Sequence, residues 1–168
     1  STGELDEICF KYITDVQKAI PANVGYRGFK KTLCTSINQV ICHGIPDTNR
    51  ILKSGDIMNI DVTVIKDGWH GDTSKMFLIG KAQSHNERLV RVTQECLYKG
   101  IEAAKPGARL GDIGNAIQIH AEKNYYSVVE EYCGHGIGKI YHDEPQILHY
   151  GEPNTGQEII EGMCFTIE

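Results

Sequence analysis

The sequence lacks the features that mark membrane, secreted and nucleic-acid-binding proteins. No apolar run approaches the ~18 residues of a membrane-spanning helix. The six cysteines form no CxxC pair and no dense framework, which favours reduced thiols in a cytoplasmic protein and disfavours a structural cysteine-type zinc site. The 17 lysines and arginines are scattered, so no basic stripe predicts binding to nucleic acid. With 40% hydrophobic and 23% charged residues, the composition is that of a globular domain with a substantial core.

Both ends of the chain are unusual for a complete domain. The sequence opens at Ser1 without a methionine, and it stops at Glu168 within the apolar run 163–168. We therefore expect a piece of a longer polypeptide.

Helical and strand patterns are mixed along the chain, which predicts an α+β fold. Apolar residues recur at helical spacing in three segments, branched residues cluster in 57–65, and the turn signal Asp67-Gly68 predicts a return strand after it. The predicted helices are about 3–18, 86–104 and 110–124, and the predicted strands are 57–65, 69–79, 34–42 and 165–168.

Three short segments are echoed later in the chain in the same order. Residues 2–5 resemble 110–113, residues 42–45 resemble 133–137, and residues 55–61 resemble 162–168. This pattern predicts a duplicated unit within one incomplete domain, 1–168. The first half-repeat covers about 1–80, a connecting helix about 86–105 and the second, truncated half-repeat about 109–168.

Two carboxylates are expected to lie close together on one strand pair. If Asp67 and Gly68 form a two-residue hairpin turn, Thr63 pairs with Asp72 and Asp61 with Ser74. Asp61 and Asp72 are then diagonal neighbours on one face, with Cα atoms about 7 to 8 Å apart. Such a pair is either a solvated face with two ordinary acids or a cation site.

Further residues favour the cation site. Glu168 would be the duplicate of Asp61, and His135 supplies an imidazole within a glycine-rich stretch, 134–138. Three carboxylates and one histidine suit a centre of two divalent ions such as Mn²⁺, Fe²⁺, Co²⁺ or Zn²⁺. We interpret these glycines as positions that leave space around the backbone at His135, and not as a phosphate-binding loop. His43 and His142 lie beside glycine or proline turns and are further candidates for functional residues. We interpret the remaining histidines as surface or hydrogen-bonded residues: His70, His85, His120 and His149.

At these residues the sequence resembles the type I methionine aminopeptidases of bacteria. The resemblance implies the pita-bread fold, in which two αβ halves related by a pseudo-twofold axis enclose two metals. The motifs that carry it span nearly the whole chain: Cys42-His-Gly-Ile-Pro46, Asn59-Ile-Asp-Val-Thr63, Asp67-Gly-Trp-His-Gly-Asp-Thr73, Tyr132-Cys-Gly-His-Gly-Ile-Gly138, His142-Asp-Glu-Pro145 and Phe165-Thr-Ile-Glu168.

The resemblance also implies a role for each matching residue. Asp61 would chelate one metal, Asp72 would bridge both, and His135 and Glu168 would bind the second. Glu168 would also accept a proton from the water. His43 would contact the substrate near the scissile amide, and His142 would stabilise the oxyanion. The apolar pocket for the methionine side chain would be formed by Tyr26, Phe29, Cys34 and Tyr141.

The implied activity is removal of the N-terminal methionine from nascent proteins and peptides that have a small second residue. A hydroxide bridging two metals (Co, Mn, Fe or Zn) would attack the methionine carbonyl. The enzyme would be a cytoplasmic monomer that acts near the ribosome, and it would have no specific nucleic-acid or membrane partner. Two alternatives stay open. One is a proline-specific peptidase of the prolidase or aminopeptidase P type, and the other is a pita-bread binding module without catalysis.

The family also has a bridging Glu and a pocket Trp on strands that would follow position 168. We therefore expect the 168 residues alone to be inactive, because one bridging carboxylate is missing and the sheet edge beside Glu168 is unpaired. Methionine release by this polypeptide with added Mn²⁺ or Co²⁺, compared with a longer chain, tests the expectation.

Overall fold

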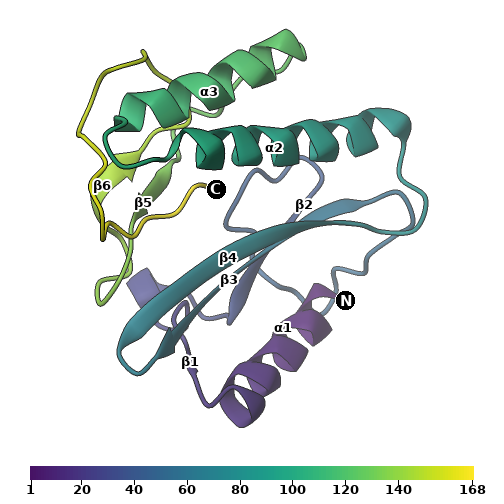
Figure 1. Ribbon diagram of the computed structural model, residues 1–168. Helices are drawn as coiled ribbons and strands as arrows, with labels where there is room; N and C mark the ends of the chain where they lie inside the picture. Colours follow the sequence, from purple (N-terminus) through teal and green to yellow (C-terminus); the bar gives the residue numbers. More distant parts are fainter. The chain divides into compact units, whose positions relative to one another are not determined.

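The computed structural model describes residues 1–168, which form two compact units, 1–87 and 88–168. Figure 1 shows the mixture of helices and strands, which confirms the predicted α+β class. Helix α2 (Ser84–Ala103) crosses from the first unit into the second. None of the helices combines the length and the apolar character needed to cross a membrane.

Unit 1 begins with helix α1 (Thr2–Lys11), which continues as one π-helical turn (Tyr12–Val16). The N-terminus is closed by a capping box, since Glu4 N donates to Ser1 Oγ at 3.2 Å and the Ser1 amino group donates to the Glu4 carboxylate at 2.6 Å. The predicted helix over residues 3–18 is confirmed, with its last two residues outside the helical segment.

The sheet of unit 1 is built around strand β3 (Ile57–Lys66). Strands β1 (Ile20–Pro21) and β2 (Leu33–Ile37) share one edge of β3, and β4 (Trp69–Leu78) pairs along the other edge. Asp67 and Gly68 connect β3 to β4 with φ values of 52° and 83°, the left-handed pair that a type I′ hairpin turn requires. The predicted pairing of Thr63 with Asp72 and of Asp61 with Ser74 is confirmed.

Two predicted strands are wrong, one in its extent and the other in its existence. The strand expected over 34–42 ends at Ile37, because Asn38 adopts φ 54° and its side-chain amide donates to Asp56 Oδ1 at 2.8 Å, which turns the chain away from β3. The segment 165–168 is not a strand. Phe165 makes a single bridge to Gly136, and the register of the adjacent strand shifts at that residue, so the ladder does not propagate.

Unit 2 places helices α2 and α3 (Leu110–Lys123) side by side (Figure 1). They confirm the two predicted helices, and their apolar faces pack with strand β6 (Asp143–Ile147). Strand β5 (Gly134–Gly136) pairs with β6; neither strand was predicted from the sequence. The core consists of Val92, Cys96, Leu110, Ile113, Ile117, Ala121, Ile147 and Ile159.

The start of α1 and the start of α3 share one local arrangement. Gly3 N donates to Asp47 O at 3.1 Å, and Gly111 N donates to Thr155 O at 3.0 Å. Each glycine lies so close to its loop that a Cβ would be 2.8 Å from Thr48 N in unit 1 and 2.4 Å from Thr155 Oγ1 in unit 2. The paired contacts coincide with the repeated sequence segments; the half-repeat boundaries given above stay a prediction.

Substituting Gly111 by alanine should destabilise unit 2. The new Cβ would lie 2.4 Å from Glu152 O, and this backbone oxygen cannot move without displacing its loop. We expect the free energy of unfolding to fall by about 1 to 3 kcal/mol, the usual cost of overpacking. Urea unfolding followed by circular dichroism measures the loss. Gly71→Ala is the matched control, because its Cβ would meet only Val64 Cγ2 at 3.9 Å, and an equal loss in both variants would contradict the prediction.

Candidate metal centre

In unit 1 the two predicted acidic ligands lie on one face of the β2–β3–β4 sheet. Asp61 is directly opposite Cys34 on β2 and Ser74 on β4, and Asp72 is opposite Thr63. Asp61 and Asp72 are half-buried, while Thr63 is fully buried. The hairpin therefore presents two carboxylates from neighbouring strands, as its predicted register requires.

The electrostatic character of this face is visible at the Cys34 thiol. Burial, and to a lesser degree the nearby groups Asp61, Cys42 and Asp72 in that order, together raise the pKa of Cys34 to about 12. The thiol is thus neutral at physiological pH. The two carboxylates contribute a smaller part of this shift through their negative charge, and the same charge favours a cation bound beside them.

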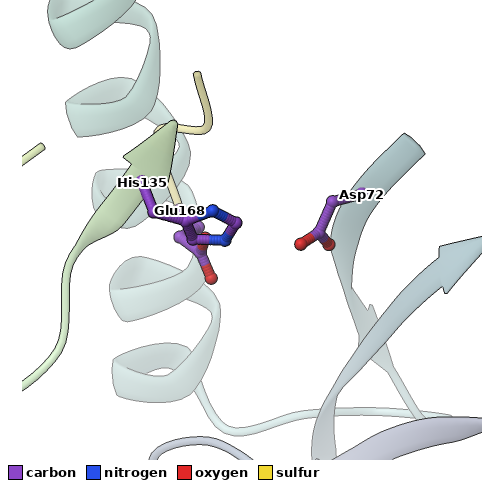
Figure 2. A group of neighbouring side chains, drawn as sticks. All are labelled: Asp72, His135 and Glu168. Atoms are coloured by element: carbon purple, nitrogen blue, oxygen red, sulfur yellow. The ribbon is translucent and has the colours of Figure 1, made fainter. Parts of the chain in front are cut away.

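In unit 2, His135 and Glu168 face each other. His135 lies on β5 and is 8% exposed, and its Nε2 is 3.4 Å from Glu168 Oε1 on the C-terminal segment. Figure 2 shows both side chains, and it also draws Asp72 projecting from β4 of unit 1. On the other side of the imidazole ring, His135 Nδ1 is 2.9 Å from Gly136 O.

These contacts fix the role of each ring nitrogen. A carbonyl oxygen only accepts, so Nδ1 of His135 carries the proton donated to Gly136 O. In the neutral ring, Nε2 then presents a lone pair to a carboxylate oxygen 3.4 Å away, and these two acceptors attract only if a proton or a cation lies between them. A backbone carbonyl that orients a histidine in this way is typical of metal sites. The donor set fits a divalent ion.

Two residues near Glu168 were missed by sequence reasoning. Thr166 Oγ1 donates to Glu168 Oε1 at 2.7 Å. Glu168 N donates to His149 Nε2 at 3.4 Å, and burial lowers the pKa of His149, which favours the neutral ring that can accept. The alternation of Thr166 and Glu168 in an extended segment was the one signal that could have identified Thr166, because residues two apart share a side.

The structure brings two other predicted residues next to His135. The rings of Tyr141 and His142 stack with centroids 4.1 Å apart, and the His142 ring is 4.3 Å from that of His135. Tyr141 itself approaches His135 edge-on at 6.2 Å. Unit 2 therefore gathers four of the predicted site residues in one cluster: His135, Tyr141, His142 and Glu168.

His43 follows β2 in a strained loop conformation. Its φ is 55°, the left-handed region that non-glycine residues seldom adopt. The next residue is held firmly, since Thr35 N donates to Gly44 O at 2.7 Å and Gly44 N donates to Ser36 Oγ at 3.1 Å. An exposed histidine held by β2 in a fixed backbone conformation is suited to contacting a ligand.

The predicted pocket residues of unit 1 stay a prediction. Tyr26 and Phe29 lie at the ends of one 3₁₀ turn, in which Phe29 N donates to Tyr26 O at 2.9 Å, and Cys34 is buried on β2. Two cavities of about 240 and 260 Å³ in this unit are lined by other residues.

The sequence matches known proteins over its whole length. The model of metallopeptidase family M24 matches residues 1–168. Methionine aminopeptidase of Salmonella typhimurium is 60% identical over 168 residues, which are 100% of this chain and 64% of that protein. This chain therefore spans about 64% of the length of the curated relatives it matches.

Solved structures give the same result. Methionine aminopeptidase from Rickettsia prowazekii matches with a TM-score of 0.97 at 54% identity, covering 99% of this chain and 66% of that chain. Prolidase from Pyrococcus furiosus matches with a TM-score of 0.70 at 23% identity, covering 80% of this chain and 40% of that chain, and this likeness concerns the fold alone. The pita-bread fold expected from the sequence is confirmed.

Proposed function

Because the chain belongs to metallopeptidase family M24, we propose that the protein carrying it removes the N-terminal methionine from nascent polypeptides and peptides. The observation that carries the proposal is the 60% identity to a methionine aminopeptidase across all 168 residues. The six sequence motifs between Cys42 and Glu168 support the same activity. A preference for a small second residue belongs to this proposal.

The proposed metal ligands are Asp61 and Asp72 from the hairpin of unit 1, and His135 and Glu168 from unit 2. Asp61 would hold one ion, Asp72 would bridge two, and His135 and Glu168 would hold the second. The hydrogen bond from His135 Nδ1 to Gly136 O, which leaves Nε2 facing the Glu168 carboxylate, supports this assignment. Bound divalent ions (Co, Mn, Fe or Zn) would supply an activated water nucleophile and Lewis-acid polarisation of the scissile carbonyl.

The chain's own residues would orient the substrate and move the proton. Glu168 is proposed to accept a proton from the attacking water and pass it to the leaving amine. His142 would donate a hydrogen bond to the developing oxyanion, and its stacking against Tyr141 at 4.1 Å supports a fixed ring. His43 would contact the substrate near the scissile amide. Tyr26, Phe29, Cys34 and Tyr141 would surround the methionine side chain.

The setting is proposed from the same family membership. The protein would act in the cytoplasm on polypeptides near the ribosome, as a monomer and without a specific nucleic-acid or membrane partner. The chain would form one incomplete catalytic domain of two half-repeats, at about 1–80 and 109–168, joined by the helix at about 86–105.

A peptide assay on the intact gene product distinguishes this activity from its alternatives. We expect metal-dependent release of methionine from Met-Ala-Ser and little cleavage of an Ala-Pro dipeptide, because the site has the Cys42–Pro46 motif of the methionine enzymes. Preferential cleavage of Ala-Pro would instead support a proline-specific peptidase. Metal binding without turnover of either peptide would support a binding module.

A further inference from the structure

The Thr166 hydroxyl joins the two proposed ligands of unit 2. His135 N donates to Thr166 Oγ1 at 3.0 Å, and Thr166 Oγ1 donates to Glu168 Oε1 at 2.7 Å. Since Glu168 Oε1 is also 3.4 Å from His135 Nε2, the contacts form a closed ring of three residues. One hydroxyl thus connects the backbone of one ligand with the carboxylate of the other.

The direction of these hydrogen bonds follows from their chemistry. A backbone N–H can only donate, so Thr166 Oγ1 must accept from His135 N. The hydroxyl has a single hydrogen, and an ionised carboxylate can only accept, so that hydrogen is directed to Glu168 Oε1. A hydrogen bond from a hydroxyl to a charged oxygen is among the stronger kinds in proteins.

Thr166 is itself held in place by the backbone. Thr166 N donates to His135 O at 2.8 Å, and Gly134 packs so closely that a Cβ there would lie 2.2 Å from Thr166 O. The hydroxyl therefore projects from an anchored position. The Glu168 side chain is 40% exposed, against 10% for that of His135, so packing restricts its rotamer less and a hydrogen bond has more effect on its orientation.

We propose that Thr166 is a positioning residue, whose hydroxyl holds the Glu168 carboxylate in the orientation that binds a divalent ion together with His135. This inference rests on the proposed metallopeptidase function. Glu168 Oε1 is oriented through the Thr166 hydrogen bond, while the Gly136 carbonyl orients His135, so each ligand of unit 2 has its own supporting group.

The test uses the intact gene product, stripped of metal and titrated with Mn²⁺ in a calorimeter. Thr166→Val keeps the shape but removes the hydroxyl, and we expect Mn²⁺ affinity to fall by about 10- to 100-fold, the usual effect of losing a residue that supports a ligand. Thr166→Ser restores the O–H and should bind within about threefold of the unsubstituted protein. Thr155→Val, which removes a hydroxyl bonded to Glu152 O at 2.7 Å in a loop, should bind normally.

Each outcome bears on one of the two proposals. Unchanged Mn²⁺ affinity in Thr166→Val, or an equal loss in Thr166→Ser, would overturn the role of the hydroxyl and leave the proposed function standing. Absence of Mn²⁺ binding by the unsubstituted protein would overturn the proposed function, and this inference with it. Melting temperatures of all variants without metal show whether a loss of binding follows from a loss of folding.

Discussion

Replacing His135 by alanine should reduce metal-dependent methionine release by about 100- to 1,000-fold, the usual effect of losing one group that stabilises the transition state. The imidazole is 8% exposed, its Nδ1 is committed to Gly136 O, and its Nε2 faces the Glu168 carboxylate. Alanine offers no lone pair at that position. The measurement is methionine release from Met-Ala-Ser by the intact gene product, together with the number of Mn²⁺ ions bound per chain.

A second histidine of unit 2 provides the control for this experiment. His120 Nε2 is 2.8 Å from Glu95 Oε2, and the pair connects α3 with α2 on the outside of the unit. His120→Ala should therefore retain both activity and bound metal, with at most a small loss of stability. If His135→Ala kept full activity and metal content while folding normally, His135 would not be a ligand, and the proposed centre would have to be rebuilt without it.

The arrangement of the proposed ligands of unit 1 could be predicted from sequence for a physical reason. Asp67-Gly68 permits one tight turn type, and that turn fixes every cross-strand pair of the hairpin. Side-chain direction then follows from the twofold period of the strand, which places Asp61 and Asp72 on one face. Local rules were sufficient because the contacts lie within a single hairpin.

The half in unit 2 could be predicted only in part. His135 was identified by its flanking glycines, but β5 is the three-residue segment Gly134–Gly136 and shows no apolar alternation. Its hydrogen bonds reach Thr166, 31 residues away, and its strand partner β6 contains two acids and a proline, which are poor strand signals. The strand predicted over 165–168 is wrong for the same reason. Its neighbour β5 is short and its register shifts at Gly136, so the two segments form one bridge and not a continuous ladder.

Gly134→Ala should abolish most of the activity although it removes no functional group. The added Cβ would lie 2.2 Å from Thr166 O, 2.9 Å from Thr166 C and 3.2 Å from Ile147 Cβ, so the C-terminal segment must move away from β5. That movement breaks the 2.8 Å bond from Thr166 N to His135 O and displaces Glu168 relative to His135. A shift of about 1 Å in a catalytic group costs on the order of 100-fold in rate, so we expect at least that loss of methionine release.

Gly111→Ala is the variant that separates displacement of the centre from general destabilisation. Its Cβ would also meet backbone, 2.4 Å from Glu152 O, so both variants should lose about 1 to 3 kcal/mol of stability through overpacking. Of these two glycines, Gly134 alone lies against the segment that carries Glu168. At a temperature where both variants remain folded, Gly111→Ala should retain its activity and Mn²⁺ affinity while Gly134→Ala loses both. Equal activity in the two variants would show that Gly134 serves stability alone. The spacing between β5 and Thr166 would then not set the geometry of the ligands.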